Sequence, residues 1–312
     1  MRGVGVIEFG GPDALQVVDL PEVHAGPGEV RIRVHAASVN PTDTGLRSGG
    51  RAAATEQDPP PYIPGMDAAG VIDEVGAGTD TVLAVGDAVM AMVLPKASHG
   101  AYRESIVLKA DAVVRAPAGT THVEAATLPM NGLTARQSLD QLALQPGQTV
   151  AVTGAAGCYG GYVVQLAKAD GLHVIADASD ADAQLVRDLG ADIVVPRGDD
   201  IAEQIRKMAP DGVDGLADGA VQNELATGAV RDGGAFASVR FWGGTGERGI
   251  EFHRTMVRDY DRRADLLDRL RQQAEDGAIT LRVAATYAPE DAAEAHRRLE
   301  AGGTRGRCVI VF

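Results

Sequence analysis

The stretch Val150-Ala-Val-Thr-Gly-Ala-Ala-Gly-Cys-Tyr-Gly-Gly-Tyr-Val-Val-Gln-Leu-Ala-Lys168 decides the fold. It reads as a short β-branched strand, a glycine-broken turn and an amphipathic helix. Its glycines are spaced Gly154-x-x-Gly157-x-x-Gly160, which differs from the usual G-x-G-x-x-G. Gly154 permits a tight turn, Gly157 lets a diphosphate approach the backbone, and Gly160 lets the helix pack closely on the strand. Because the N–H groups of a helix N-terminus bind anions, the stretch predicts a dinucleotide site, with an ordinary strand–helix turn as the alternative.

The rest of the 312-residue chain shows two patterns, and its length favours two domains. Residues 1–120 are β-rich, with alternating or β-branched runs between Gly/Pro turns. From about residue 121 helical and strand patterns alternate, as they do in a doubly wound parallel sheet. We therefore expect an α/β protein with a β-rich domain and a Rossmann domain.

Composition excludes several classes of function. The formal net charge of −14 repels nucleic acids and anionic membranes, and 4% aromatic residues are too few for a base-stacking platform. No apolar run is long enough to span a membrane, and no signal peptide is visible, so we expect a cytoplasmic protein. The two cysteines and the scattered histidines form no zinc pattern, and we expect no bound metal.

Short motifs extend over nearly the whole chain in a fixed order. Besides the glycine turn they are Ser38-Val-Asn-Pro-Thr-Asp43, Pro64-Gly-Met-Asp-Ala-Ala-Gly70, Gly86-Asp-Ala-Val89, Gly100-Ala-Tyr-Arg-Glu104, Leu128-Pro-Met-Asn-Gly-Leu-Thr-Ala135, Leu189-Gly-Ala-Asp192 and Ala295-His-Arg-Arg-Leu-Glu-Ala-Gly-Gly-Thr-Arg-Gly-Arg307. With these motifs the chain resembles the zinc-free quinone oxidoreductase (zeta-crystallin-like) branch of the medium-chain dehydrogenase/reductase superfamily.

The resemblance implies a domain organisation and a reaction class. It implies a GroES-like catalytic domain made of residues 1–120 and 278–312, with a Rossmann dinucleotide-binding domain of residues 121–277 inserted between them. Zinc-dependent relatives carry cysteine, histidine and cysteine where this chain has Asn40, Met66 and a position near Met130. None of these residues serves as a catalytic zinc ligand. The resemblance therefore implies hydride transfer to a small-molecule quinone or α,β-unsaturated carbonyl.

The same resemblance names candidate catalytic residues: Asn40, Asp43 and Thr134. We expect Asn40 to donate a hydrogen bond near the nicotinamide ribose or the substrate carbonyl, the alternative being a residue that holds a turn. Asp43 is expected to order its own loop more than to act as an acid. Thr134 is expected beside the nicotinamide, with a helix cap as the alternative. Tyr62 and Tyr102 can offer a proton or simply pack.

The predicted cofactor contacts lie in the glycine turn and beyond it. They are Ala156, Gly157, Cys158, Tyr159 and Gly160, together with Phe241 and Trp242 after a later strand; Trp242 has core packing as its alternative. Two departures from the family pattern put the quinone acceptor in question. Gly45 replaces a common tyrosine, and Cys158-Tyr159 replaces Gly-Val, which should place bulk beside the diphosphate.

The choice of dinucleotide depends on the end of the second Rossmann strand. Asp177 lies twenty residues after Gly157, which favours the ribose hydroxyl of NAD. By the family pattern the discriminating position is instead Ser179, whose hydroxyl suits a 2′-phosphate, and Arg197 can supply a cation. We predict NADPH, with NADH as the alternative.

The sequence thus predicts a zinc-independent, NADPH-dependent reductase. The alternatives are an NADPH-binding regulatory or structural protein with little turnover, and an NAD-linked dehydrogenase. The resemblance implies a homodimer joined edge to edge through the Rossmann sheets, with the strand at 235–239 as the candidate edge. The loop from Arg47 to Pro64 is expected to line the substrate pocket.

Overall fold

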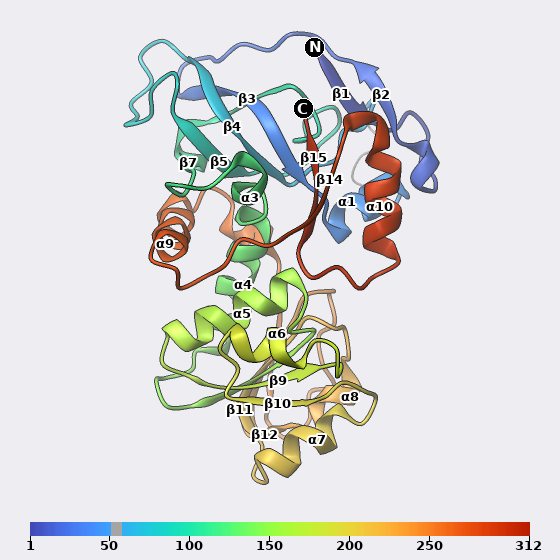
Figure 1. The fold of residues 1–312 in the computed structure, drawn as a ribbon, viewed down its shortest axis with the longest axis vertical. Helices are drawn as coiled ribbons and strands as arrows, with labels where there is room; N and C mark the ends of the chain where they lie inside the picture. Colours follow the sequence, from blue (N-terminus) through green and yellow to red (C-terminus); the bar gives the residue numbers. More distant parts are fainter. Residues whose placement is uncertain (51–57) are drawn as a thin grey trace. The chain divides into compact units, whose positions relative to one another are not determined.

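A computed structural model describes residues 1–50 and 58–312. Residues 51–57 of the predicted substrate loop lie outside this described part. The chain divides into two compact units (Figure 1). Unit 1 comprises Met1–Met130, Asp261–Glu275 and Leu281–Phe312, and unit 2 comprises Asn131–Tyr260 and Asp276–Thr280. Residues 121–130 and helix α9 (Ala264–Glu275), placed in the Rossmann domain from the sequence, group with unit 1.

Unit 1 is built on an open sheet that joins both ends of the chain. Within the described residues the strand order is β14 (Val283–Tyr287), β15 (Arg307–Val311), β3 (Glu29–Ser38), β4 (Asp67–Val75), β5 (Ala88–Met92) and β7 (Val113–Arg115), with β6 (Ser105–Lys109) also paired to β3. The C-terminal strand β15 runs antiparallel to β3, with Val309 opposite Ser38. In Figure 1 the red C-terminal strands accordingly lie beside the blue β3.

Alternation along β3 explains why this sheet forms. Val30, Ile32 and Val34 are at most 2% exposed and point to one core, while their neighbours are more exposed. A small sheet of β1 (Arg2–Gly5) and β2 (Gln16–Asp19) closes part of this core. The helical elements of unit 1 are η1 (Pro12–Ala14), α1 (Pro41–Arg47), η2 (Ala110–Ala112), α3 (His122–Ala125), α9, η4 (Pro289–Asp291) and α10 (Ala292–Glu300).

Unit 2 is a doubly wound parallel sheet, which confirms the predicted α/β fold class. Its strand order among the described residues is β10 (Ile193–Pro196), β9 (His173–Ala178), β8 (Thr149–Thr153), β11 (Val213–Asp218), β12 (Val230–Ser238) and β13 (Glu251–Arg254). Helices cover both faces: α5 (Cys158–Ala169) and α6 (Ala183–Asp188) lie on one, α7 (Ile201–Met208) and α8 (Glu224–Thr227) on the other (Figure 1). Helix α4 (Pro129–Leu142) leads into the unit and η3 (Val257–Tyr260) ends its main segment.

The strand order reverses between β8 and β11. From β8 the chain winds outward through β9 to β10, and then returns to β11 on the other side of β8. In open α/β sheets, ligands bind at such a switch point, outside the carboxyl ends of the strands. The glycine turn follows β8 and therefore begins at this point.

The edge strand differs from the prediction. The strand predicted at 235–239 is β12, and it is internal because β11 and β13 flank it. The expectation that it forms a sheet edge is wrong. The edge strands of the described sheet are β10 and β13. Strand β13 has four residues and one apolar side chain, Phe252, so no alternating or β-branched pattern marks it in the sequence.

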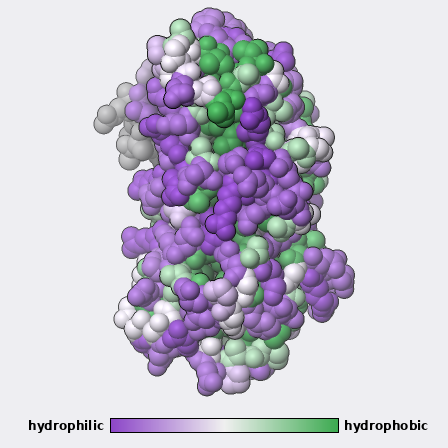
Figure 2. Space-filling model, turned by 90° about the vertical axis from the view of Figure 1, so that its left-hand side faces the viewer, coloured by the Kyte–Doolittle hydropathy of each residue, from purple (hydrophilic) through white to green (hydrophobic). Residues whose placement is uncertain are grey.

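Hydrophilic residues predominate on the face shown in Figure 2, with apolar residues gathered mainly near its upper end. The described residues include no helix long and apolar enough to cross a membrane.

Close packing between α5 and the glycine turn leads to the first prediction. A Cβ atom on Gly160 would lie 2.3 Å from the carbonyl oxygen of Gly154 and 2.8 Å from the Cα atom of Ala155. We expect Gly160→Ala to lower the free energy of unfolding by about 3 kcal/mol, because backbone atoms must move to admit the methyl group. Urea denaturation followed by circular dichroism measures the change.

Gly45→Ala is the matched control, because Gly45 also lies in a helix and a Cβ atom added to it would meet no other atom within 4 Å. This variant should be more stable than the wild type by about 0.5–1 kcal/mol through helix propensity. Equal stability of the two variants would contradict the packing argument.

Candidate active site

The unit 1 part of the candidate site is a buried polar cluster at the end of β3. Ser38, Asn40, Asp43 and Asp67 are all 0% exposed. Strand β3 ends at Ser38, and the following Pro41 starts α1 with the backbone angle that a first helical turn requires. Asn40 stays extended at φ −122° and ψ 158°, between the two elements.

Asn40 is bound through its side-chain amide. Its Nδ2 donates to Oδ2 of Asp67 at 2.7 Å and to Oγ of Ser38 at 3.3 Å. Ser38 Oγ itself donates to Asp67 Oδ2, so these two acceptors lie together on one side of the amide nitrogen. The hydrogen bond from Asn40 to a nicotinamide ribose or a substrate carbonyl stays a prediction.

Asp43 accepts hydrogen bonds from the backbone. Its Oδ2 accepts the N–H of Asn40 at 2.8 Å, and its Oδ1 accepts the N–H of Gly65 at 2.9 Å. Burial raises the pKa of Asp43 to about 7, against the lowering effect of these two backbone donors. The contacts are those of a residue that orders its loop, which is the role expected from the sequence.

A chain of buried side chains continues from Asp43 to the C-terminal helix α10. The hydroxyl of Tyr102 lies 3.4 Å from Oδ2 of Asp43 and 3.2 Å from Nε2 of His296. On the other side of the imidazole, Nη1 of Arg47 lies 3.4 Å from Nδ1, and Nη2 of Arg47 donates to Glu300 at 2.7 Å. Because an arginine only donates, Nδ1 is the acceptor, Nε2–H donates to Tyr102, and Tyr102 donates to Asp43.

This arrangement decides between the two roles considered for the tyrosines. Tyr102 is 0% exposed, and burial raises the pKa of its hydroxyl well above the ordinary value, so it is a packed structural residue. The Tyr62 hydroxyl donates to the carbonyl oxygen of Asp58 at 2.9 Å, and its ring stacks on Phe9. The sequence gives no sign that Arg47 and His296 are partners, because 249 residues separate them.

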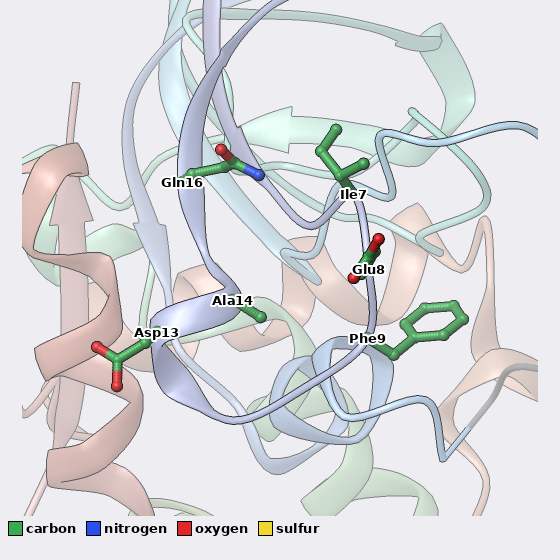
Figure 3. A pocket seen from close by; sticks show the side chains of 6 residues that line it. All are labelled: Ile7, Glu8, Phe9, Asp13, Ala14 and Gln16. Carbon is green, nitrogen blue, oxygen red and sulfur yellow. The ribbon is translucent and has the colours of Figure 1, made fainter.

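An open surface pocket of unit 1 lies apart from this cluster. Figure 3 shows its lining side chains: Ile7, Glu8, Phe9, Asp13, Ala14 and Gln16. Asp13 forms an ion pair with Arg297. None of these residues contributes to the polar cluster around Asn40.

In unit 2 the glycine turn has the shape that a diphosphate requires. Gly154 has φ +67°, a conformation that other residues rarely adopt, and Gly157 is the N-cap residue of α5. A Cβ atom on Gly157 would meet only the carbonyl oxygen of Gly154, at 3.1 Å, so the turn is open beside Gly157. Beside Gly160, by contrast, backbone atoms of Gly154 and Ala155 fill the space. Ala156 and Cys158 flank Gly157, and Cys158 is buried.

Tyr159 is held between α4 and β11. The position of a Cβ on Gly219, after β11, lies 2.7 Å from Cδ1 of Tyr159. The Tyr159 hydroxyl lies 2.7 Å from Oγ of Ser138, whose own hydrogen is donated to the carbonyl oxygen of Thr134 at 3.0 Å. Tyr159 is therefore the donor to Ser138, and its ring is directed at these partners. The space that this bulky residue needs is supplied by the missing side chain of Gly219.

Thr134 lies inside α4, five residues after its first residue. The helix-cap alternative for this threonine is therefore wrong, because a capping residue precedes the first turn. Its side chain is 9% exposed.

The end of β9 carries the residues expected to choose the dinucleotide. Asp177 is 2% exposed; its Oδ1 accepts the N–H of Ala155 at 3.1 Å, and its Oδ2 has no hydrogen-bond partner within the described part of the chain. Burial raises the pKa of Asp177, and the charge of Arg197 opposes this rise. Ser179 donates to Asp182 at 2.7 Å. The N–H of Arg197 donates to the carbonyl oxygen of Ala178, which places Arg197 beside this strand end.

Trp242 belongs to an aromatic cluster. Its ring packs edge-on against Phe236 at 5.1 Å and against Phe252 at 5.3 Å between ring centroids. Phe241 is 61% exposed at φ +63°. These ring contacts support the alternative that Trp242 packs in the core. A role of Phe241 and Trp242 in cofactor binding stays a prediction.

At the positions where zinc-dependent relatives are expected to carry metal ligands, this chain has amide and thioether side chains. The described residues include no group of three or more His, Cys, Asp or Glu side chains placed to hold a metal ion. Thr42 donates a hydrogen bond to the sulfur of Met66 at 2.8 Å, and Asn40 is bound as described above. Amide and thioether groups are poor ligands for zinc.

Comparison with known proteins identifies the family. Residues 26–118 match the alcohol dehydrogenase GroES-like domain, and residues 189–310 match a zinc-binding dehydrogenase family. The human mitochondrial NAD(P)H oxidoreductase RTN4IP1 is 30% identical over 340 aligned positions, which cover 93% of this chain and 83% of the human protein. The chain belongs to the medium-chain dehydrogenase/reductase superfamily.

Other members of this superfamily show its range. The chloroplastic NADPH-dependent alkenal/one oxidoreductase of Arabidopsis thaliana is 32% identical over 73% of this chain and 59% of its own length. A solved NAD-dependent alcohol dehydrogenase has a TM-score of 0.89 at 30% identity, over the whole of both chains. A mycobacterial quinone oxidoreductase has a TM-score of 0.83 at 29% identity, also over both whole chains. The GroES-like and Rossmann fold class inferred from the motifs is confirmed.

The environment of His296 gives a prediction about pH. Burial, and secondarily the charge of Arg47, lower the pKa of His296 from 6.5 to about 3. The unfolded chain then binds a proton between these values that the folded chain does not bind, so stability falls as the pH falls below 6.5. From pH 6.5 to about pH 5 this residue alone should cost about 1.5 kcal/mol.

His296→Gln removes this titration and should therefore lose less stability on acidification than the wild type. Urea denaturation of both proteins over this pH range measures the difference in slope. Parallel pH profiles would contradict a buried, neutral imidazole at this position.

Proposed function

We propose that the protein is an NADPH-dependent reductase that transfers a hydride to a quinone or an α,β-unsaturated carbonyl compound. The observation that carries this proposal is the open glycine turn at Gly157, placed where the strand order reverses between β8 and β11. The names of the Arabidopsis and mycobacterial relatives support the acceptor class. A homodimer in the cytoplasm remains our expectation from the sequence.

The chain's residues fit a dinucleotide. A diphosphate would be held at the N-terminus of α5, beside Ala156, Gly157 and Cys158, because helix N-termini stabilise anions. A side chain at Gly157 would fill the approach to this turn. Ser179 and Arg197, at the ends of neighbouring strands, are proposed to hold a 2′-phosphate, since Arg197 also offsets the charge of Asp177.

When bound, the reduced nicotinamide supplies a hydride. The protein must then orient the acceptor and stabilise the negative charge that develops on its oxygen. We assign the orienting role to Asn40, whose amide is fixed by Asp67 and Ser38, and a packing role beside the nicotinamide to Thr134. Quinones and enones are already electrophilic, which suits a site whose Asn40, Met66 and Met130 replace the zinc ligands of relatives.

A second candidate function is favoured by one observation. The Oδ2 atom of Asp177 is buried without a hydrogen-bond partner among the described residues, and a carboxylate at this strand end binds a ribose hydroxyl in NAD-dependent proteins. The name of the similar NAD-dependent alcohol dehydrogenase agrees with this alternative. Such a protein would be an NADH-linked dehydrogenase.

The decisive experiment is NADPH oxidation by the purified protein, followed by absorbance, with a quinone and a simple enone in parallel. We expect turnover with at least one of them. Gly157→Val serves as the matched control: it should retain the fold, because one carbonyl oxygen alone crowds the new side chain, but lose NADPH binding and turnover. Tight NADPH binding by the wild type without any turnover would favour the regulatory alternative instead.

The choice of cofactor has its own prediction. Arg197→Ala should weaken NADPH binding by about tenfold and leave NADH binding nearly unchanged, because the lost cation would face only the 2′-phosphate. Isothermal titration calorimetry with both nucleotides measures the two affinities. Arg187→Ala, which removes an exposed cation from α6, is the control and should change neither. If Asp177→Asn weakened NADH binding while Arg197→Ala had no effect, the NADH-linked alternative would be favoured.

A further inference from the structure

Asp67 is a buried carboxylate with a full set of hydrogen-bond donors. It is the first residue of β4 and is 0% exposed. The backbone N–H of Met130 donates to its Oδ1 at 2.6 Å, and Nδ2 of Asn40 donates to its Oδ2 at 2.7 Å. The hydroxyl of Ser38 donates to the same Oδ2 atom. All three contacts lie within unit 1.

These donors come from separate segments of the chain. Ser38 and Asn40 lie at the end of β3, and Met130 lies 63 residues beyond Asp67, in the first turn of α4. Met66 precedes Asp67 directly. The carboxylate therefore ties together the segments that carry Asn40, Met66 and Met130, the positions at which zinc-dependent relatives are expected to carry their metal ligands. In this chain a hydrogen-bonded anion joins those segments.

The carboxylate also determines how the amide of Asn40 faces. An asparagine amide can exchange its oxygen and nitrogen by turning about its last side-chain bond, and only its hydrogen-bond partners select one orientation. A carboxylate accepts and does not donate, so Asp67 selects the orientation in which Nδ2 faces it. Ser38 reinforces this choice, because its oxygen accepts from Nδ2 while its hydrogen is directed to Asp67.

The charge of Asp67 has compensation inside the unit. Burial raises the pKa of Asp67, while the donors Ser38, Met130 and Asn40 lower it, as does the positive charge of Arg307 on β15. N–H groups contact both carboxylate oxygens, an arrangement that stabilises the ionised form. The C-terminal strand thus contributes to the electrostatics of a cluster formed mainly by the first third of the chain.

We propose that Asp67 is a positioning residue for the reductase reaction and that it acts through Asn40 by fixing the direction of its amide. This inference rests on the proposed function, in which Asn40 orients the acceptor. An amide turned about would present the opposite pattern of donor and acceptor to any bound molecule. The site therefore depends on one orientation of the Asn40 amide, and a neighbouring residue, Asp67, selects that orientation.

The first test replaces the carboxylate by an amide. Asp67→Asn keeps the shape of the side chain, but its NH2 group must face either the N–H of Met130 or the NH2 of Asn40. We expect kcat to fall by about tenfold or more while the NADPH dissociation constant stays within about twofold, since the glycine turn lies in the other unit. Asp73→Asn, the same change on the same strand at a residue paired with Arg31, is the matched control and should leave kcat unchanged.

A double-variant comparison separates positioning from a general effect on the fold. If Asp67 acts through Asn40, then Asp67→Asn combined with Asn40→Ala should be no slower than the slower single variant. Multiplication of the two single effects would overturn the proposal. An unchanged rate in Asn40→Ala would overturn it as well, together with the orienting role of Asn40.

Exchanging the pair guards against a variant that fails to fold. In Asn40→Asp/Asp67→Asn, the amide at 67 can accept from Met130 through its oxygen and donate to the carboxylate at 40, so the exchanged pair and Met130 keep their contacts. We expect thermal stability to return to near the wild-type value while kcat remains low, because the amide now stands at the wrong position. Recovery of kcat, or failure of the exchanged pair to restore stability, would contradict the proposal.

A spectroscopic measurement is independent of turnover. In ¹⁵N-labelled wild type, the side-chain NH2 signal of Asn40, assigned by its absence in Asn40→Ala, should exchange slowly with solvent, and it should shift in Asp67→Asn but not in Asp73→Asn. An unshifted signal would overturn the positioning role even if the protein reduces its substrate. Conversely, a shifted signal in a protein that turns over no acceptor would leave the hydrogen bond in place and contradict only the proposed function.

Discussion

A carboxylate removed from water needs hydrogen-bond donors in place of the water, or its burial costs several kcal/mol. Three buried aspartates in the described chain, Asp43, Asp67 and Asp218, satisfy this need with hydrogen bonds that include backbone N–H groups, and Asp177 does so through Oδ1 alone. Each of them fixes a turn or a segment junction at the end of a strand or the start of a helix. Asp218, for example, accepts the N–H groups of Gln222 and Asn223 after β11 and a hydrogen bond from Thr153 of β8. The same interaction therefore shapes both units.

Much of the fold follows from local sequence. The β-branched run before Gly154, the glycine spacing and the amphipathic pattern after it predict a strand, a turn and a helix, and the structure has them as β8 and α5. Gly154 adopts φ +67°, and a Cβ on Gly160 would collide with the backbone of the turn, which are the two roles assigned to these glycines. Asn40 and Asp43 are recognisable because their partnership is local: the side chain of Asp43 accepts the N–H of Asn40, three residues before it. Patterns of this kind are readable because they depend on residues close together in the chain.

The remaining parts of the site depend on contacts that no local pattern encodes. Arg47 reaches His296 across 249 residues, and Asp67 reaches Met130 across 63 residues. From the sequence, Asp67 is only a member of a Pro-Gly motif, and His296 is one histidine among seven. The edge strand β13 escapes prediction for a related reason: it is four residues long, and its place in the sheet is set by pairing with β12 after a long turn. Burial of a polar side chain becomes informative only once its partners are known.

The proposed contacts in the two units differ in how much they depend on side chains. In unit 2 the proposed diphosphate contacts are made by the backbone, so side chains at the turn can vary as long as their bulk finds room. Tyr159 illustrates this: its ring lies against Gly219 and its hydroxyl reaches Ser138, while the turn keeps its glycine geometry. In unit 1 the proposed acceptor contacts come from a side chain, Asn40, whose orientation depends on the hydrogen-bond direction set by another side chain. A change at Asp67 therefore alters which atom of the Asn40 amide faces the proposed acceptor, even when the backbone is unchanged. A change at Cys158 or Tyr159 need not alter the proposed diphosphate contacts, because the backbone makes them.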